Sequence, residues 1–267
     1  MSNHGWGLTL AFAAFLGAAG QAEAAQIPAC AGEAEVSGAR VNRVEKNGDI
    51  VLDDGRAAVA EGIRLPAGAA DRAPEFLADQ AMTALKQLTT GKKVDFYVHV
   101  PKEDRYGRLR AQVIILDGDP DSWLQVALLS RGLARVDIAP DRTECAAELY
   151  AAERVARQAK QGIWVSSAYA VRTPDTLAAD TGTFQIVQGT VTQTSVVNGR
   201  AYLNFGMDWK TDFTVSISPD DMKTFAAAGV DPRAYQGKTV RVRGMVQQLN
   251  GPEIEIATPV AIESGAP

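Results

Sequence analysis

Apolar and polar positions alternate in short runs through two separate parts of the chain. In the first part the runs break at Asn47-Gly48 and at Asp53-Asp54-Gly55, which are turn signals between strands. The alternation predicts three strands before residue 64, namely Val36–Val44, Asp49–Leu52 and Ala57–Ile63. Two more strands are predicted after residue 91, namely Lys93–Val100 and Leu109–Leu116.

Helical spacing of apolar residues is found three times in this part. A helix that begins near Pro74 carries its apolar residues three or four positions apart and ends at Gly91. A second helix is predicted over Ser122–Arg131. A third is predicted from Asp141, with Glu144 completing a capping box, and it ends near Gly162.

The second part repeats the order of three strands, one helix and two strands. Its elements are the strands Phe184–Thr194, Arg200–Phe205, Asp212–Ile217, Thr239–Gln248 and Glu253–Ile262 and the helix Pro219–Ala228. Asn198-Gly199 and Asn250-Gly251 mark its hairpin turns. We therefore predict an α+β chain that is mainly β. It has an OB-type barrel with three helices over residues 30–165, a linker over 166–183 and a second OB-like barrel over 184–263.

The first 24 residues have the composition of a secretory signal peptide. A short apolar run, Leu8–Ala19, is followed by Ala22 and Ala24, which form an A-x-A cleavage site. A membrane anchor at the N-terminus is the alternative. Removal of residues 1–24 would leave a periplasmic or secreted protein with no transmembrane segment.

Export changes the interpretation of the two cysteines, Cys30 and Cys145. An oxidising compartment favours a disulfide between them, which would close a loop of 145 − 30 = 115 residues. Two separate buried thiols are the alternative.

The charge balance gives no general attraction to nucleic acid. The chain has 27 Lys and Arg against 32 Asp and Glu, a formal net charge of −5. Residues 36–165 hold 19 of each sign, and residues 180–263 hold 7 basic and 9 acidic residues. Phosphate-tracking proteins normally carry a basic face. Arg241 and Arg243 share one strand face, and Arg200, Lys210 and Trp209 are candidates to lie near it. One interpretation is a cationic substrate-binding groove with an aromatic platform, which would suit single-stranded nucleic acid; an ordinary solvated strand face is the alternative.

Five short motifs in the first part occur in a specific order. They are Asn47-Gly48-Asp49-Ile50, Gly62-Ile63-Arg64-Leu65-Pro66, Asp104-Arg105-Tyr106-Gly107-Arg108, Gly132-Leu133-Ala134-Arg135-Val136 and Gly162-Ile163-Trp164. Together they resemble the staphylococcal nuclease (thermonuclease) family over roughly residues 34–165. The resemblance implies a calcium ion and two arginines acting on a phosphodiester.

Carried over position by position, the resemblance implies a partly retained site. Asp49 matches a calcium-ligating aspartate, Arg108 matches a phosphate-clamping arginine, and Tyr106 matches a tyrosine beside the phosphate. The remaining family positions fall on unsuitable residues: the second arginine on Val59, the second calcium aspartate on Arg64, a backbone ligand on Leu65, the base glutamate on Ala67, and the base-embracing aromatics on Ile138 and Pro140.

These departures remove the groups on which the chemistry depends. A positioned electrostatic donor contributes roughly 10²–10³ in rate and a general base roughly 10²–10⁴. Arg64 also places a cation where a cation should bind, so no cofactor is expected. Glu61, Asp71 and Glu75 flank the same loop and could supply replacement carboxylates; surface acids are the alternative. Asp49 could simply finish a turn, and Arg108 could pair with Asp104 or Glu103.

The sequence therefore predicts an exported, non-catalytic binding module derived from a nuclease. Its partner would be nucleic acid, another protein or a component of the cell envelope. The alternative is a Ca²⁺-dependent phosphodiester hydrolase with a rearranged site. The histidines, His4 and His99, are too few for a His-rich metal site, and no Cys-x-x-Cys or phosphate-cradling Gly-Lys-Ser/Thr motif is present.

Overall fold

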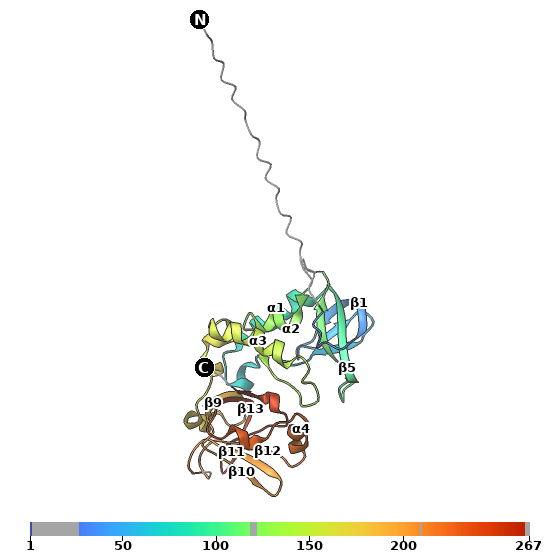
Figure 1. Cartoon of the computed structure of the whole chain (residues 1–267). Coiled ribbons are helices and arrows are strands. Elements are labelled where there is room, and N and C mark those ends of the chain that lie inside the picture. The colour runs from blue at the N-terminus through green and yellow to red at the C-terminus, as the bar shows by residue number, and fades with distance from the viewer. Residues whose placement is uncertain (2–26, 118–121, 209, 265–267) are drawn as a thin grey trace.

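The computed structural model describes residues 1, 27–117, 122–208 and 210–264 (Figure 1). The predicted signal peptide, apart from Met1, lies outside the described residues. Within the described part of the chain, no helix combines the length and the apolar character that a membrane crossing requires.

The first sheet closes into a five-stranded barrel. Its strands are β1 (Glu33–Val44), β2 (Ile50–Leu52), β3 (Ala57–Ala60), β5 (Lys93–Glu103) and β6 (Leu109–Ile115). β1 pairs antiparallel with β2 and with β5, and β5 pairs antiparallel with β6. A parallel pairing of β3 with β6, with Ala58 opposite Leu109, closes the ring. The predicted OB-type barrel is therefore confirmed, and its alternate side chains, such as Ile50, Phe96 and Val113, are fully buried.

Three short strands complete the first part. The predicted strand Ala57–Ile63 is divided: β3 ends at Ala60, and β4 (Ile63–Arg64) pairs instead with β8 (Arg135–Val136). β7 (Ser122–Trp123) extends the barrel sheet beside β6. The predicted helix over Ser122–Arg131 is therefore shorter, because its first two residues form a strand.

The helices of the first part are α1 (Glu75–Thr89), α2 (Leu124–Leu129) and α3 (Ala146–Gln158). α1 buries Leu77, Ala81 and Leu85, the spacing from which it was predicted. The predicted start of α3 was wrong. Asp141 does not cap the helix, because its carboxylate accepts hydrogen bonds from Arg110 at 2.6 and 2.9 Å, and the helix begins five residues later, after Cys145.

The segment predicted as a linker is ordered and packed. It contains two 3₁₀ helices, Ser167–Tyr169 and Pro174–Asp180, and a third, Gly162–Val165, comes just before it. Tyr169 is 2% exposed and Leu177 is fully buried. Arg72, just before α1, donates to the carbonyl oxygens of Ala179 and Thr181. The connection therefore fixes the two parts together instead of separating them.

The second sheet has seven strands and repeats the pairing of the first. Its elements are β9 (Phe184–Thr190), β10 (Gln193–Val197), β11 (Arg200–Asn204), β12 (Thr214–Ile217), α4 (Asp221–Ala227), β13 (Thr239–Leu249), β14 (Gly251–Glu255) and β15 (Ile262–Ser264). β9 and β10 form the predicted first strand, broken at Val191–Thr192; β9 pairs with β13, and β10 pairs with β11. β12 pairs parallel with β14, as β3 does with β6.

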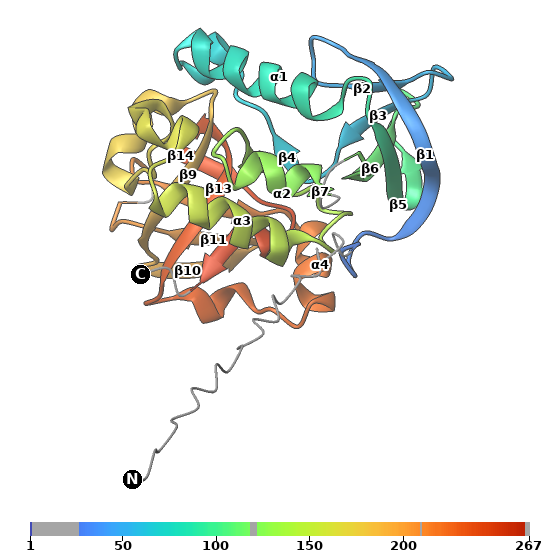
Figure 2. The same cartoon turned by 90° about the horizontal axis from the view of Figure 1, so that it is seen from above.

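The two sheets meet at α3 and β13. Figures 1 and 2 show α3 beside β9 and β13, with the first barrel on its other side. Arg243 of β13 bonds to Glu153 of α3 and to the carbonyl oxygen of Val136. The hydroxyl of Tyr150 donates to the carbonyl oxygen of Val260 at 2.7 Å.

Candidate functional site

One pocket of about 420 Å³ gathers the positions to which the family resemblance assigned chemistry. The turn before β2 supplies Asp49, β3 supplies Val59, β6 begins just after Arg108, and the segment from β4 to α1 supplies the rest. Six of the assigned positions line it, namely Asp49, Val59, Arg64, Leu65, Ala67 and Arg108. The structure therefore brings together residues that are far apart in sequence.

Asp49 and Arg108 bond to each other inside this pocket. Nη1 of Arg108 donates to Oδ1 of Asp49 at 2.8 Å, while Nε and Nη2 donate to Oδ2 of Asp104 at 2.9 and 2.6 Å. Oδ2 of Asp49 accepts from the side-chain amide of Asn47 at 2.9 Å. Each candidate group is thus occupied by a neighbouring side chain.

The ionisation of this cluster favours the paired state. The hydrogen bond to Asp104 raises the pKa of Arg108 above its ordinary value, with a smaller contribution from Asp49. Burial acts to raise the pKa of Asp104, but the hydrogen bonds that it accepts from Arg108 and Tyr106 outweigh burial and lower it. Both partners therefore stay charged, and the guanidinium faces two carboxylates.

Tyr106 lies outside the pocket lining. Its side chain is 66% exposed, and its ring lies over the guanidinium groups of Arg105 and Arg108, with centroid distances of 4.8 and 5.2 Å. The backbone N–H of Tyr106 donates to Asp104 at 2.9 Å, which fixes the turn. The exposed ring therefore stacks against the guanidinium of Arg108.

Arg64 places its guanidinium among groups that hold it at the pocket wall. Nη1 lies 3.6 Å from Oδ2 of Asp137, and Cζ lies 5.4 Å from the ring centroid of Phe184 in β9. Asp137, which follows β8, was not predicted as a site residue, because it belongs to none of the motifs that located the pocket. Arg64 and Asp137 also line an adjoining hollow of about 230 Å³ that continues to the second sheet.

Val59 lies in register with Arg110, whose guanidinium is bound elsewhere. Arg110 bonds to Asp141 at 2.6 Å and to Glu61 at 2.8 Å, and these bonds raise its pKa. Glu61 is therefore paired with a cation and does not line the pocket.

The other two carboxylates considered as replacements also have partners. Asp71 is 4% exposed, and its Oδ2 accepts from Arg135 at 2.9 Å and from the hydroxyl of Tyr169 at 3.0 Å. Glu75 accepts from the backbone N–H of Ala69 at 2.8 Å. Neither is among the residues that line the pocket, so the idea that they replace the lost carboxylates fails.

The residues of the pocket do not fit a calcium ion. Ca²⁺ takes six to eight oxygen ligands, several of them carboxylate. Here the lining offers Asp49, whose two oxygens already accept hydrogen bonds, and Asp137, which faces Arg64. Across the residues that the structure describes, no group of three or more His, Cys, Asp or Glu is arranged to hold a metal ion.

The cationic groove expected around Arg200, Arg241 and Arg243 does not form among the residues that the structure describes, and Trp209, its expected aromatic platform, lies outside them. Arg243 is 4% exposed and bonds to Glu153 at 2.9 Å and to Glu263 at 2.6 Å. Arg241 bonds to Gln188 at 2.5 Å, and Arg200 bonds to Glu255 at 3.0 Å. Arg241 and Arg243 neutralise carboxylates at the joint between the sheets, where α3 meets β13, and Arg200 is paired separately, on β11.

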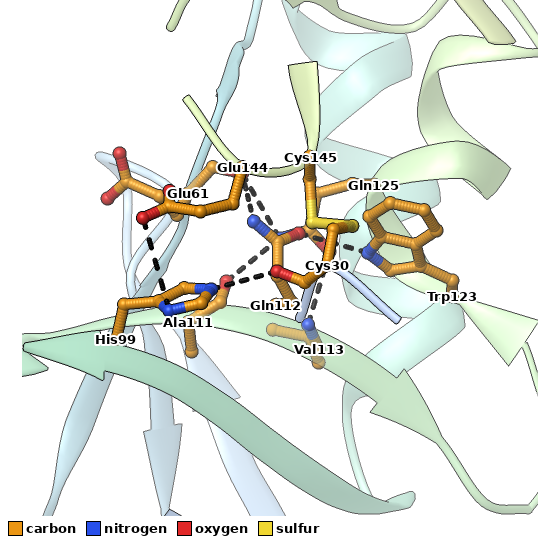
Figure 3. Close-up of a disulfide and its surroundings, with 10 residues drawn as sticks. All are labelled: Cys30, Glu61, His99, Ala111, Gln112, Val113, Trp123, Gln125, Glu144 and Cys145. Carbon is orange, nitrogen blue, oxygen red and sulfur yellow. Dashed lines mark hydrogen bonds and ion pairs between the residues drawn. A yellow bond between two sulfur atoms is a disulfide. The ribbon is translucent and has the colours of Figure 1, made fainter. Parts of the chain in front are cut away.

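The predicted disulfide is confirmed. Cys30 and Cys145 are joined, with a Cα–Cα distance of 5.1 Å, so the segment before β1 is tied to the start of α3 (Figure 3). Nε2 of His99 lies 2.8 Å from the carbonyl oxygen of Cys30, and its Nδ1 lies 4.0 Å from Glu144. His99 therefore packs beside the disulfide and away from the pocket.

A closed five-stranded barrel, with a helix between its third and fourth strands and a pocket at Asp49 and Arg108, defines an OB-like domain of the nuclease type. The family model described as staphylococcal nuclease homologue matches residues 61–166, so the chain carries a domain of that family. The match begins after β3, but β1–β3 complete the same barrel. No curated protein matches the chain.

Proposed function

We propose that this protein is exported and that its nuclease-type pocket binds a ligand without cleaving it. The observation that carries the proposal is the closed cluster of Asp49, Arg108 and Asp104. A phosphate clamp needs a guanidinium free to bond the phosphate, and a calcium site needs carboxylate oxygens free to bond the ion. In this pocket these two groups neutralise each other.

The substituted positions support the same conclusion. Val59 and Ala67 bring neither a second guanidinium nor a base to the pocket, and Arg64 contributes a positive charge next to Asp137. A general base is worth roughly 10²–10⁴ in rate and one oriented donor roughly 10²–10³, so their joint loss removes most family-type catalysis.

Export is supported by the disulfide. Structural disulfides persist in secreted and periplasmic proteins and are rare in the cytosol. The bond Cys30–Cys145 joins segments 115 residues apart, and the first 24 residues have the composition of a signal peptide. Nucleic acid, a protein or an envelope component remain the candidate ligands of the pocket.

The test is Ca²⁺-dependent digestion of single-stranded DNA by the purified mature chain. We expect no cleavage above a Ca²⁺-free control and no heat of Ca²⁺ binding by calorimetry. Arg108→Ala serves as the matched variant, because cleavage that it abolishes would belong to this pocket and would establish the hydrolase instead.

A second variant checks the assignment of positions. Val59→Arg, Arg64→Asp and Ala67→Glu together restore the family groups at the pocket that all three positions line. We expect Ca²⁺ binding to return in this triple variant. Failure of the folded triple variant to bind Ca²⁺ would contradict the positional assignment.

A further inference from the structure

The outer face of the second sheet carries a hollow that is separate from the nuclease-type pocket. It has a volume of about 430 Å³, and none of its lining residues lines the first pocket. β10, β11, β12, β14 and the turn at Asn250 supply the lining. In OB-type barrels the face of the second and third strands and the loop between the last two strands form the usual ligand surface. β11, β12 and the turn at Asn250 occupy the equivalent places.

Strand register aligns polar side chains across this hollow. The aligned residues, each opposite the next, are Gln193, Asn204, Thr214 and Glu253. Because side chains alternate along a strand, their neighbours Leu203, Val215 and Ile254 point into the core, where all three are fully buried. Ser195 and Tyr202, paired in the adjacent register, complete the polar lining.

Three of these side chains are buried although they face outward. Asn204, Thr214 and Glu253 are 9%, 8% and 7% exposed. Buried polar groups are costly unless they are hydrogen-bonded. Thr214 donates to Oδ1 of Asn204 at 3.2 Å, and Ser216 donates to Oε1 of Glu253 at 2.5 Å.

These bonds leave one donor group and one acceptor atom free to bond a ligand in the hollow. Within the described part of the chain, no hydrogen bond uses the amide NH₂ of Asn204 or Oε2 of Glu253. Glu253 also makes no ion pair there; Arg200, which interacts with it electrostatically, bonds to Glu255 and Ser216 instead. A donor and a charged acceptor are therefore available to a ligand.

The hollow has a fixed wall. A Cβ at Gly251 would lie 2.5 Å from the carbonyl oxygen of Asp212 and 2.7 Å from that of Thr211. Only glycine lets the turn between β13 and β14 approach this backbone so closely. The turn thus stands beside β12, and Leu249, 62% exposed, forms an apolar rim.

The chemistry of the lining selects one class of ligand. Its polar groups are hydroxyls, amides and one carboxylate, and no Lys or Arg is among the described residues that line it. A phosphodiester chain needs cations, and Glu253 would repel it. A sugar ring instead offers an apolar C–H face to an aromatic ring and hydroxyl groups to amides and carboxylates.

We propose that this hollow binds an uncharged oligosaccharide. The ring of Tyr202 lies under one face of a sugar, the amide of Asn204 donates to a hydroxyl oxygen, and Glu253 accepts from hydroxyl groups. This site is independent of the pocket at Asp49 and Arg108, so either proposal can fail without the other.

The test is calorimetry or saturation-transfer NMR of the full mature chain with uncharged tetrasaccharides of glucose, N-acetylglucosamine, mannose and galactose. A single-stranded oligothymidylate is the anionic comparison. We expect one of the tetrasaccharides to bind and the oligothymidylate not to compete for it. Tyr202→Ala and Glu253→Gln should each weaken that binding about tenfold or more, since each removes a contact to the sugar.

Two further variants keep the test decisive. Ser195→Trp, on strand β10, should fill the hollow and abolish binding even if Glu253→Gln does not fold. Lys223→Ala, on the exposed surface of α4, should bind as the wild type does. No binding of any tetrasaccharide, binding unchanged in Tyr202→Ala and Ser195→Trp, or displacement of the sugar by oligothymidylate would each overturn the proposal.

Discussion

Arg243 of β13 and Glu153 of α3 form a bidentate ion pair where the two parts of the chain meet. Nη1 and Nη2 of Arg243 lie 3.1 and 2.9 Å from Oε1 and Oε2 of Glu153, which is fully buried. The guanidinium also lies 4.4 Å from the ring centroid of Tyr150. Two parallel bonds of this kind fix the orientation of both side chains, so the joint between α3 and β13 is specific in geometry.

Removal of Glu153 should leave the buried guanidinium of Arg243 with Glu263 as its one remaining carboxylate partner among the described residues. Breaking a buried pair outright costs about 3–5 kcal/mol, so we expect Glu153→Ala, with Glu263 still in place, to lower the free energy of unfolding by at most this amount. Urea denaturation measures this. Asp231→Ala removes the exposed pair with Arg233 and should leave the midpoint unchanged. An equal effect of the two variants would show that the buried pair is not stabilising.

Acid should weaken the same joint through Glu263. Burial acts to raise the pKa of Glu263, but Arg243 and Arg157 outweigh burial and lower it. The folded pKa lies below the unfolded one, so its stabilisation is present above about pH 4.3 and is lost as pH falls through the lower folded value. We expect the melting temperature of the wild type to fall more steeply over that range than that of Glu263→Gln. Parallel slopes would contradict this assignment.

The disulfide should stabilise the chain mainly by restricting its unfolded state. For a separation of 115 residues, the loop-entropy relation gives about 4–5 kcal/mol. We expect the double variant Cys30→Ser, Cys145→Ser to lose about this amount in urea denaturation. A reducing agent should lower the stability of the wild type and leave the double variant unchanged. A reductant effect on both proteins would point to another cause.

Gly132 and Gly162 bring the chain before β8 against the end of α3. A Cβ at Gly132 would lie 2.1 Å from the carbonyl oxygen of Gln161, and the amide of Ile163 donates to the carbonyl oxygen of Gly132 at 2.8 Å. We expect Gly132→Ala to cost about 2 kcal/mol or more, because strain adds to the clash.

The matched control for this contact is Gly38→Ala. Gly38 has a φ of +63°, close to the +64° of Gly132, but no atom lies within 4 Å of where an added Cβ would be. Gly38→Ala should therefore lower the free energy of unfolding only by the left-handed strain, about 1–2 kcal/mol. Thermal or urea denaturation of both variants separates strain from contact, and an equal loss in the two would disprove the steric part.

Periodic patterns predicted the core elements of this fold because each buries a regular face. α1 and the five barrel strands lie close to their predicted bounds. The 3₁₀ helices within residues 166–183 were not predicted, because 3₁₀ turns have no long apolar repeat, although Tyr169 and Leu177 are buried. Asp141 resembles a helix cap locally, and only the fold reveals that Arg110 binds it.

The sequence predicted which residues line the pocket but not all of the bonds that they make there. Motif order located Asp49, Arg64 and Arg108, which line one pocket. The partner Asp137 could not be assigned, because its place beside Arg64 depends on how β4 and β8 meet. Arg243 was expected on an open face, because alternation along β13 does not reveal that α3 covers that face.

The alternation along β13 also constrains how this chain can change. Val240 and Val242 fill the core of the second sheet, whereas Arg241 and Arg243 on the other face meet carboxylates. Inserting one residue early in β13 would move its side chains to the opposite faces of the strand. The guanidinium groups would then point into the apolar core, and the valines would lie against Glu153. Natural or engineered insertions should therefore be found in the turns that flank this strand and not within it.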